Sequence, residues 1–145
     1  MTNRNSSFDT TAYAALLLRG ALGTMFIAHA LLKYYVFTLP GTVKFFESIG
    51  LPGTLAYFTF FAELIGGALI LAGIGTRWVS LALVPVLLGA TWAHAGNGWV
   101  FNAPNGGWEY PAFLTVTALA AALLGDGAYA LRNWSGMAKV SARPA

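Results

Sequence analysis

Long apolar stretches alternate with short polar segments rich in glycine and proline along most of the chain. Four of these stretches approach the ~20 residues that an α-helix needs to cross a bilayer. Between the first two, residues 43–49 put Phe45, Phe46 and Ile49 on one side of a short helix, as in a helix at a membrane interface. The pattern predicts an all-α membrane protein, an antiparallel bundle of four transmembrane helices with a short interfacial helix between spans 1 and 2. The predicted spans are about residues 12–35, 54–72, 78–95 and 109–125, with residue 131 as an alternative end of the fourth.

The composition supports the membrane interpretation. Hydrophobic residues make up 57% of the 145 positions and charged residues 9%, and the mean hydropathy is +0.65. Soluble domains carry about 25% charged residues, so this chain could not cover a water-exposed surface. The net charge of +3 comes from scattered basic residues, and we expect no nucleic-acid partner. The absence of cysteine excludes a thiolate nucleophile, a catalytic disulfide or a cysteine-ligated iron–sulfur cluster within this chain.

Basic residues near the span ends predict the orientation. By the positive-inside rule we expect both termini in the cytoplasm of a multi-pass protein of the bacterial inner (plasma) membrane. Residues 1–9 would then be a flexible cytoplasmic N-terminus, residues 10–131 the membrane domain and residues 132–145 a basic cytoplasmic tail. A signal peptide cleaved after residues 28–30 is an alternative, but Arg19 interrupts the apolar region and the apolar run continues past the site. The basic residues are Arg4, Arg77, Arg132, Lys139 and Arg143 on the cytoplasmic side, against Lys33 and Lys44 on the other.

The first span carries three basic side chains on one helical face. Arg19, His29 and Lys33 fall within an arc of about 80° at ~100° per residue. A basic group at the bilayer centre costs about 2.5–3.5 kcal/mol, so this stripe should face protein or a polar cavity. Arg19 and Glu63 lie at similar depths when residues are counted from the cytoplasmic ends of their spans. We predict a structural ion pair between Arg19 and Glu63, with a proton or quinone contact as the alternative role.

A second polar cluster is expected at the outer end of the bundle. Two histidines come at nearly the same height there, and a lysine lies one turn above the first. With two tryptophans of the aromatic belt nearby, these side chains would form a pocket for the polar head of a small amphipathic molecule. We predict no metal site, because no HxxxH or ExxH spacing is present. Hydrogen bonding of each group to neighbouring backbone is the alternative. The pocket candidates are His29, Lys33, His94, Glu109, Trp92 and Trp108.

The order of several motifs resembles the DoxX family of small bacterial inner-membrane proteins. The motifs are LLLRGALGTMFIAHALLKYY, FFESIGLPG, AELIGGALILAGIGTR, AHAGNGWVF and GGWEYP, which together span roughly residues 16–126. The resemblance implies a four-helix membrane fold and quinone-linked redox work, since the family is named after a subunit of a thiosulfate:quinone oxidoreductase. The residues that stand in matching motifs are Arg19, His29, Lys33, Glu63, Arg77, His94 and Glu109.

Two functions stay open at this point. The first is a quinone- or redox-associated subunit whose pocket binds quinone; any catalysis would be quinone-linked oxidoreduction, and no catalytic residue is assigned. The second is a non-enzymatic scaffold or partner-binding subunit of a redox or stress complex. A carrier is disfavoured because the chain lacks the repeats and broken helices of transporters. We expect no covalent cofactor; the expected partners are the lipid bilayer, quinone or another small amphipathic molecule, and redox proteins or further copies of the chain.

Overall fold

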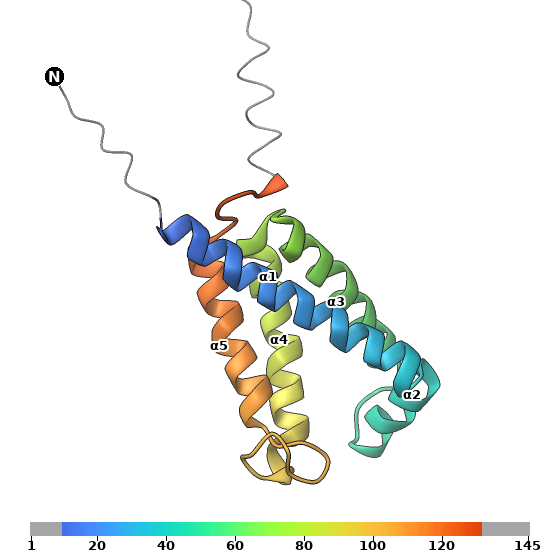
Figure 1. Ribbon diagram of the computed structural model, residues 1–145. Coiled ribbons are helices and arrows are strands. Elements are labelled where there is room, and N and C mark those ends of the chain that lie inside the picture. Colours follow the sequence, from blue (N-terminus) through green and yellow to red (C-terminus); the bar gives the residue numbers. More distant parts are fainter. Residues whose placement is uncertain (1–9, 132–145) are drawn as a thin grey trace, which may run out of the picture.

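Five α-helices joined by short turns make up the described part of the chain (Figure 1). The computed structural model describes residues 10–131, and the predicted cytoplasmic N-terminus (1–9) and basic tail (132–145) lie outside the described residues. A π-helical turn, Leu32–Val36, extends the first helix, and a 3-10 turn, Ala95–Asn97, follows the fourth. The all-helical prediction is confirmed over this range. The helices are α1 (Thr10–Leu31), α2 (Leu39–Ser48), α3 (Thr54–Ala72), α4 (Thr76–His94) and α5 (Glu109–Leu124).

Within residues 10–131, three helical segments are long and apolar enough to cross a membrane, namely Thr10–Val36, Thr54–Ala72 and Thr76–Asn97. These apolar helices make the chain a multi-pass membrane protein. α5 is also apolar, but its 16 residues are fewer than the ~20 that usually span the hydrocarbon core. The alternative end of this helix at residue 131 is wrong, because Gly125 adopts a φ of 78° and α5 ends at Leu124.

The long helices form two antiparallel pairs (Figure 1). α1 packs mainly on α3, and α4 packs mainly on α5. The start of α1, the α3–α4 turn and the end of α5 lie at one end of the molecule, whereas α2 and the α4–α5 loop lie at the other. The two pairs meet at the first end and separate toward the second, so the second end is the open one. Both pairs contribute to the buried core of Leu22, Phe26, Ile70, Leu83, Leu87, Leu114, Ala118 and Ala121.

A close glycine contact fixes the register of α1 against α3. A Cβ on Gly23 would lie 2.8 Å from the carbonyl oxygen of Gly67, and a Cβ on Gly67 would lie 2.9 Å from that of Gly23. Small residues allow such close approach of helix backbones in membranes. Since the helices are antiparallel, Arg19 comes opposite Leu71 near the end of α3. That position is about 12 Å along α3 from Glu63, at ~1.5 Å per residue.

The segment after α5 closes the end of the bundle at which α1 begins. Asp126 Oδ1 accepts a hydrogen bond of 2.7 Å from the backbone N–H of Thr76, the first residue of α4. The carboxylate thereby satisfies an amide that has no partner inside the helix. The tight α3–α4 turn uses the positive φ of Gly73 (71°) and Gly75 (64°), and a side chain at Gly73 would collide with Ala130.

The helix predicted between the first two spans is present, but it begins at Leu39 and not near residue 43. Thr38 caps it, since Thr38 Oγ1 accepts a hydrogen bond of 3.2 Å from the backbone N–H of Gly41. Pro40 lies in the first turn, where the missing N–H removes no helical hydrogen bond. α2 therefore starts four residues earlier than predicted, and it lies at the open end of the bundle (Figure 1).

Candidate functional site

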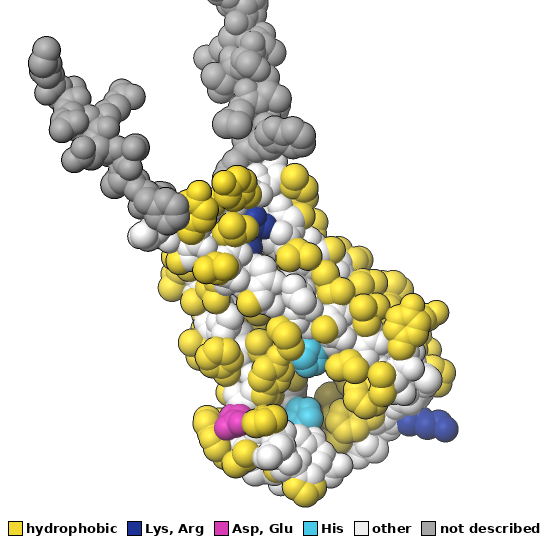
Figure 2. All heavy atoms as spheres, viewed as in Figure 1, with side chains coloured by type: hydrophobic (Ala, Val, Ile, Leu, Met, Phe, Trp, Pro, Cys, Tyr) yellow, Lys and Arg dark blue, Asp and Glu magenta, His cyan; other side chains and the backbone are white. Residues whose placement is uncertain are grey.

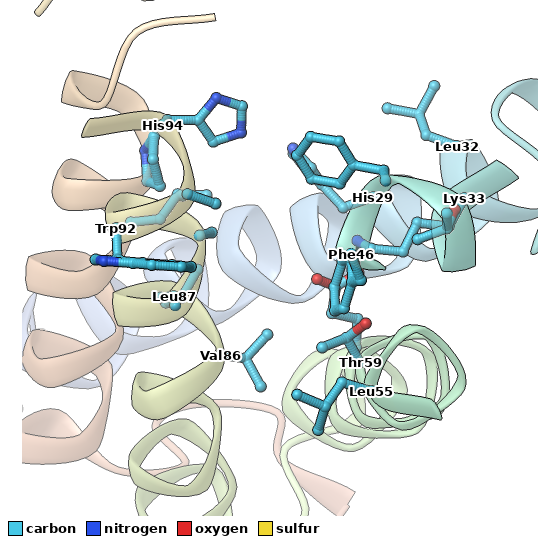
Figure 3. A pocket seen from close by; sticks show the side chains of 18 of the residues that line it. His29, Leu32, Lys33, Phe46, Leu55, Thr59, Val86, Leu87, Trp92 and His94 are labelled. Carbon is cyan, nitrogen blue, oxygen red and sulfur yellow. Dashed lines mark hydrogen bonds and ion pairs between the residues drawn. The ribbon is translucent and has the colours of Figure 1, made fainter. Parts of the chain in front are cut away.

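A cavity of about 920 Å³ lies between the helices at the end where the two pairs separate. All five helices contribute to its walls, and most of the lining is apolar, including Phe46 of α2, Leu55 of α3, and Val86 and Leu87 of α4 (Figure 3). Figure 2 shows both histidines, in cyan, beside a hollow in the surface at this end. The cavity has the size and the apolar walls of a small-molecule site.

One ion pair lies in the cavity wall. Lys33 Nζ is 2.6 Å from Glu63 Oε2, and both residues line the cavity. The side chains are only 17% and 9% exposed, respectively. Lys33 belongs to the π-helical turn that continues α1. Such turns alter the direction of side chains and are frequent at functional sites. The pair supplies charge-assisted hydrogen bonding inside an otherwise apolar space.

The predicted ion pair of Arg19 with Glu63 is wrong. Counting residues from the span ends treated those ends as level, whereas the Gly23–Gly67 register offsets α1 against α3. Glu63 therefore meets Lys33, near the other end of the first span. Glu63, which was predicted for the structural pair, therefore lines the cavity together with Lys33.

Arg19 binds backbone carbonyls at the closed end of the bundle. Its Nη1 donates to the carbonyl oxygen of Leu71, and its Nη2 donates to that of Ala128 at 2.9 Å. Arg19 is 3% exposed. The fork of the guanidinium suits this bridge between two segments, because it presents several donors in fixed directions. Arg19 thus ties the end of α3 to the segment after α5 and takes no part in the cavity.

The two histidines enter the cavity from different helices. His29 of α1 and His94 of α4 lie on opposite walls in Figure 3, and both line the cavity. His29 Nδ1 lies 2.8 Å from the carbonyl oxygen of Met25, and the ring stacks on Tyr110 at a centroid distance of 5.8 Å. His94 Nδ1 lies 3.0 Å from the carbonyl oxygen of Gly106. Each imidazole is held by one nitrogen, which leaves the other edge of the ring for the cavity.

Four of the six residues predicted for the pocket line this cavity: His29, Lys33, His94 and Trp92. Glu109 and Trp108 do not, and they border a separate groove on the surface. Glu109 Oε1 accepts a hydrogen bond of 2.9 Å from the backbone N–H of Phe101, so the carboxylate holds the α4–α5 loop. Trp108 packs edge-to-face on Trp99 at 4.5 Å between ring centroids. Both contacts depend on how the α4–α5 loop folds, and the sequence of this loop has no hydrophobic periodicity from which its fold could be predicted.

The predicted pocket did not include Glu63 or Tyr110, and both line the cavity. Tyr110 stacks on His29 at the wall of the cavity. The stripe of basic residues on the first span could have led to Glu63, since Lys33 lies on that stripe and needed an acidic partner. Within residues 10–131, no three histidine, aspartate or glutamate side chains are grouped as metal ligands would be.

The fold and the cavity define a class: helical multi-pass membrane proteins with a largely apolar internal cavity that contains buried polar groups. The chain belongs to the DoxX family, whose model matches residues 14–96. It is similar to a Bacillus subtilis (strain 168) protein named "Putative oxidoreductase CatD", with 37% identity over 128 residues and 88% of each chain covered. The resemblance seen in the sequence motifs is therefore confirmed. No solved structure matches the chain.

Proposed function

We propose that this DoxX-family protein is a redox-associated membrane protein that binds a quinone-type molecule in the cavity between its helices. The observation that carries the proposal is the combination of apolar walls with an ion pair and two imidazoles inside one cavity of about 920 Å³. A quinone has the matching chemistry, namely an apolar ring with oxygen atoms that need hydrogen-bond partners. The name of the Bacillus subtilis relative, "Putative oxidoreductase CatD", agrees with a redox role.

The head group of a bound quinone would lie near Lys33. The Lys33 ammonium has three N–H donors, and one of them donates to Glu63. The other N–H groups remain available for a ligand oxygen. The ring would pack against aromatic and aliphatic walls, and Trp92 of α4 is one of them. The two helix pairs separate toward the end where α2 lies, so a hydrophobic tail could leave between them toward lipid (Figure 1).

We also propose the finer topology. α5 would be the fourth span of an antiparallel bundle, because it runs along the whole of α4 and carries an apolar surface. The charge bias would put both termini in the cytoplasm of a bacterial inner membrane. Reporter fusions after Gly75 and after Asn105 test this orientation. A cytoplasmic signal after Gly75 and a periplasmic signal after Asn105 are expected, and the reverse pattern contradicts it.

Quinone binding is tested with the purified protein in detergent. A decyl-substituted 1,4-benzoquinone should bind the wild type, and the substitution Lys33→Met should weaken that binding by at least about tenfold, since it removes a charged hydrogen-bond donor. The matched control is Lys44→Met, which removes an exposed lysine on α2. Equal losses in both variants would argue against a head-group site at Lys33. The scaffold alternative predicts that no quinone binds and that a stoichiometric protein partner copurifies.

A further inference from the structure

We propose that the cavity prefers the reduced form of its ligand, an aromatic diol, over the corresponding dione. This inference rests on the proposed quinone-binding function and specifies the chemical state of the ligand. The two forms differ in hydrogen-bonding capacity, because a diol can donate and accept, whereas a dione can only accept. The preference therefore depends on whether the cavity offers acceptors that only the diol can satisfy.

The contact of His29 with its own helix determines which ring nitrogen carries the proton. Nδ1 lies 2.8 Å from the carbonyl oxygen of Met25, one turn earlier in α1. A carbonyl oxygen has no proton to donate, so a hydrogen bond at this distance requires the proton on Nδ1. In the neutral imidazole the Nε2 atom is then a lone-pair acceptor.

His94 reaches the same state through the α4–α5 loop. Nδ1 lies 3.0 Å from the carbonyl oxygen of Gly106 and 3.1 Å from that of Asn105. The amide of Asn97 also comes within 3.4 Å of Nδ1, but its Nδ2 makes a shorter hydrogen bond of 2.9 Å with the Gly106 carbonyl oxygen. Two carbonyl oxygens thus compete for a proton on Nδ1 of His94, and Nε2 is again left as the acceptor.

The two Nε2 atoms are free acceptors at the cavity. Both rings line it from opposite walls, and within residues 10–131 no protein group hydrogen-bonds to either Nε2. A ring between the walls that carries hydroxyl groups on opposite sides could donate one hydrogen bond to each histidine.

The donors of the cavity do not cancel this preference. The Lys33 ammonium and the Tyr110 hydroxyl can donate to a ligand oxygen, and a diol oxygen also keeps lone pairs that can accept such a bond. The two imidazole Nε2 acceptors can receive a hydrogen bond from the diol but not from the dione, whereas the Glu63 carboxylate already accepts one from Lys33. A dione would instead bury two lone pairs without a partner, which is the costly arrangement. The geometry thus points to a cavity whose hydrogen-bond donors can bind both the diol and the dione, whereas its imidazole acceptors can bind only the diol.

The size of the effect follows from the two acceptors. Leaving one buried acceptor unpaired typically weakens binding by about tenfold, so we expect the diol to bind at least about tenfold more tightly than the dione. Because tighter binding of the reduced form stabilises that form, the midpoint potential of the bound couple should rise by about 30 mV for each tenfold difference in affinity.

The test compares three probes on the full-length protein in detergent micelles under argon. The probes are a decyl-substituted 1,4-benzoquinone, its hydroquinone kept reduced by dithionite, and the bis(methyl ether) of that hydroquinone, which has the same ring but no O–H donor. Dissociation constants are measured by equilibrium dialysis. The hydroquinone should bind most tightly, and the dione and the ether should bind about equally and at least about tenfold more weakly.

Substitutions at the histidines assign the effect. His29→Phe keeps a ring to stack on Tyr110 but removes the acceptor, whereas His29→Gln keeps an amide oxygen that can accept. His29→Phe should weaken hydroquinone binding by about tenfold more than it weakens dione binding, and His29→Gln should restore part of that difference. A purely structural role of His29 would instead weaken both probes equally.

The outcomes separate the two proposals. If both redox forms bind with equal affinity, or if the dione binds more tightly, the preference is refuted while the quinone-binding function stands. If the ether binds as tightly as the hydroquinone, the acceptor argument is also refuted, since donation would play no part. If none of the probes binds the wild type, the proposed function fails and this inference fails with it.

Discussion

The pairing of Lys33 with Glu63 gives a prediction whose magnitude follows from the geometry. The charged atoms are 2.6 Å apart, and the side chains are 17% and 9% exposed. Removal of one partner from a buried pair leaves an uncompensated charge and costs about 3–5 kcal/mol. Because the pair borders a cavity that water can enter, we expect the lower end, about 3 kcal/mol, for Lys33→Met or Glu63→Leu alone. The double substitution should cost about 1 kcal/mol or less, since neither charge is then left buried.

The assay is a double-mutant cycle on the unfolding of the bundle in mixed detergent micelles, followed by tryptophan fluorescence. The predicted coupling between Lys33 and Glu63 is the difference between the summed single losses and the double loss. Lys44→Met, an exposed lysine on α2, is the matched control and should change stability by no more than about 0.5 kcal/mol. Additive losses at Lys33 and Glu63 would refute a direct, buried pair.

Three further predictions concern the packing around the site. Gly23→Ala should destabilise the protein by about 1–3 kcal/mol, because the added Cβ would meet backbone atoms of α3. Gly20→Ala, where the added Cβ has open space around it, should be neutral or stabilising. Thermal unfolding of the two variants distinguishes these outcomes. The charge swap Arg19→Glu with Glu63→Arg should yield no more folded protein than the worse single variant, and recovery of wild-type yield would contradict the separation of these residues. Glu109→Gln should leave the dissociation constant for quinone, measured by dialysis, within about twofold of the wild-type value, because the Glu109 carboxylate contacts the loop outside the cavity. A tenfold loss of affinity would show that Glu109 contributes to the binding site.

Much of the architecture could be predicted from the sequence because apolar runs of membrane length carry a strong signal. The three spans that qualify by length and composition agree with the predicted ones to within two residues at each end. His29, Lys33 and His94 were also expected together, because each is a polar residue near the same end of an apolar run, and the cavity brings them together.

The errors arose where three-dimensional packing, and not local pattern, determines contacts. The Arg19–Glu63 pair required the offset between α1 and α3, which depends on the contact of Gly23 with Gly67 and has no counterpart in either helix alone. The side chain of Glu109 turns back to the amide of Phe101 because the α4–α5 loop folds over the start of α5. Loops of this kind are governed by individual hydrogen bonds, so residue order gives little warning of them.

Photoaffinity labelling tests the central claim, that a quinone-type ligand lies in the cavity between the helices, most directly. The protein is irradiated with an azido-substituted 1,4-benzoquinone in detergent micelles, with and without excess unlabelled decylbenzoquinone, and the labelled peptides are identified by mass spectrometry. We predict that the competed label falls on cavity residues such as Phe46, Trp92 and Tyr110, and that Lys33→Met reduces it while Lys44→Met does not. Competed label confined to lipid-facing residues such as Leu17 or Leu123, or label that excess quinone does not displace, would contradict the account.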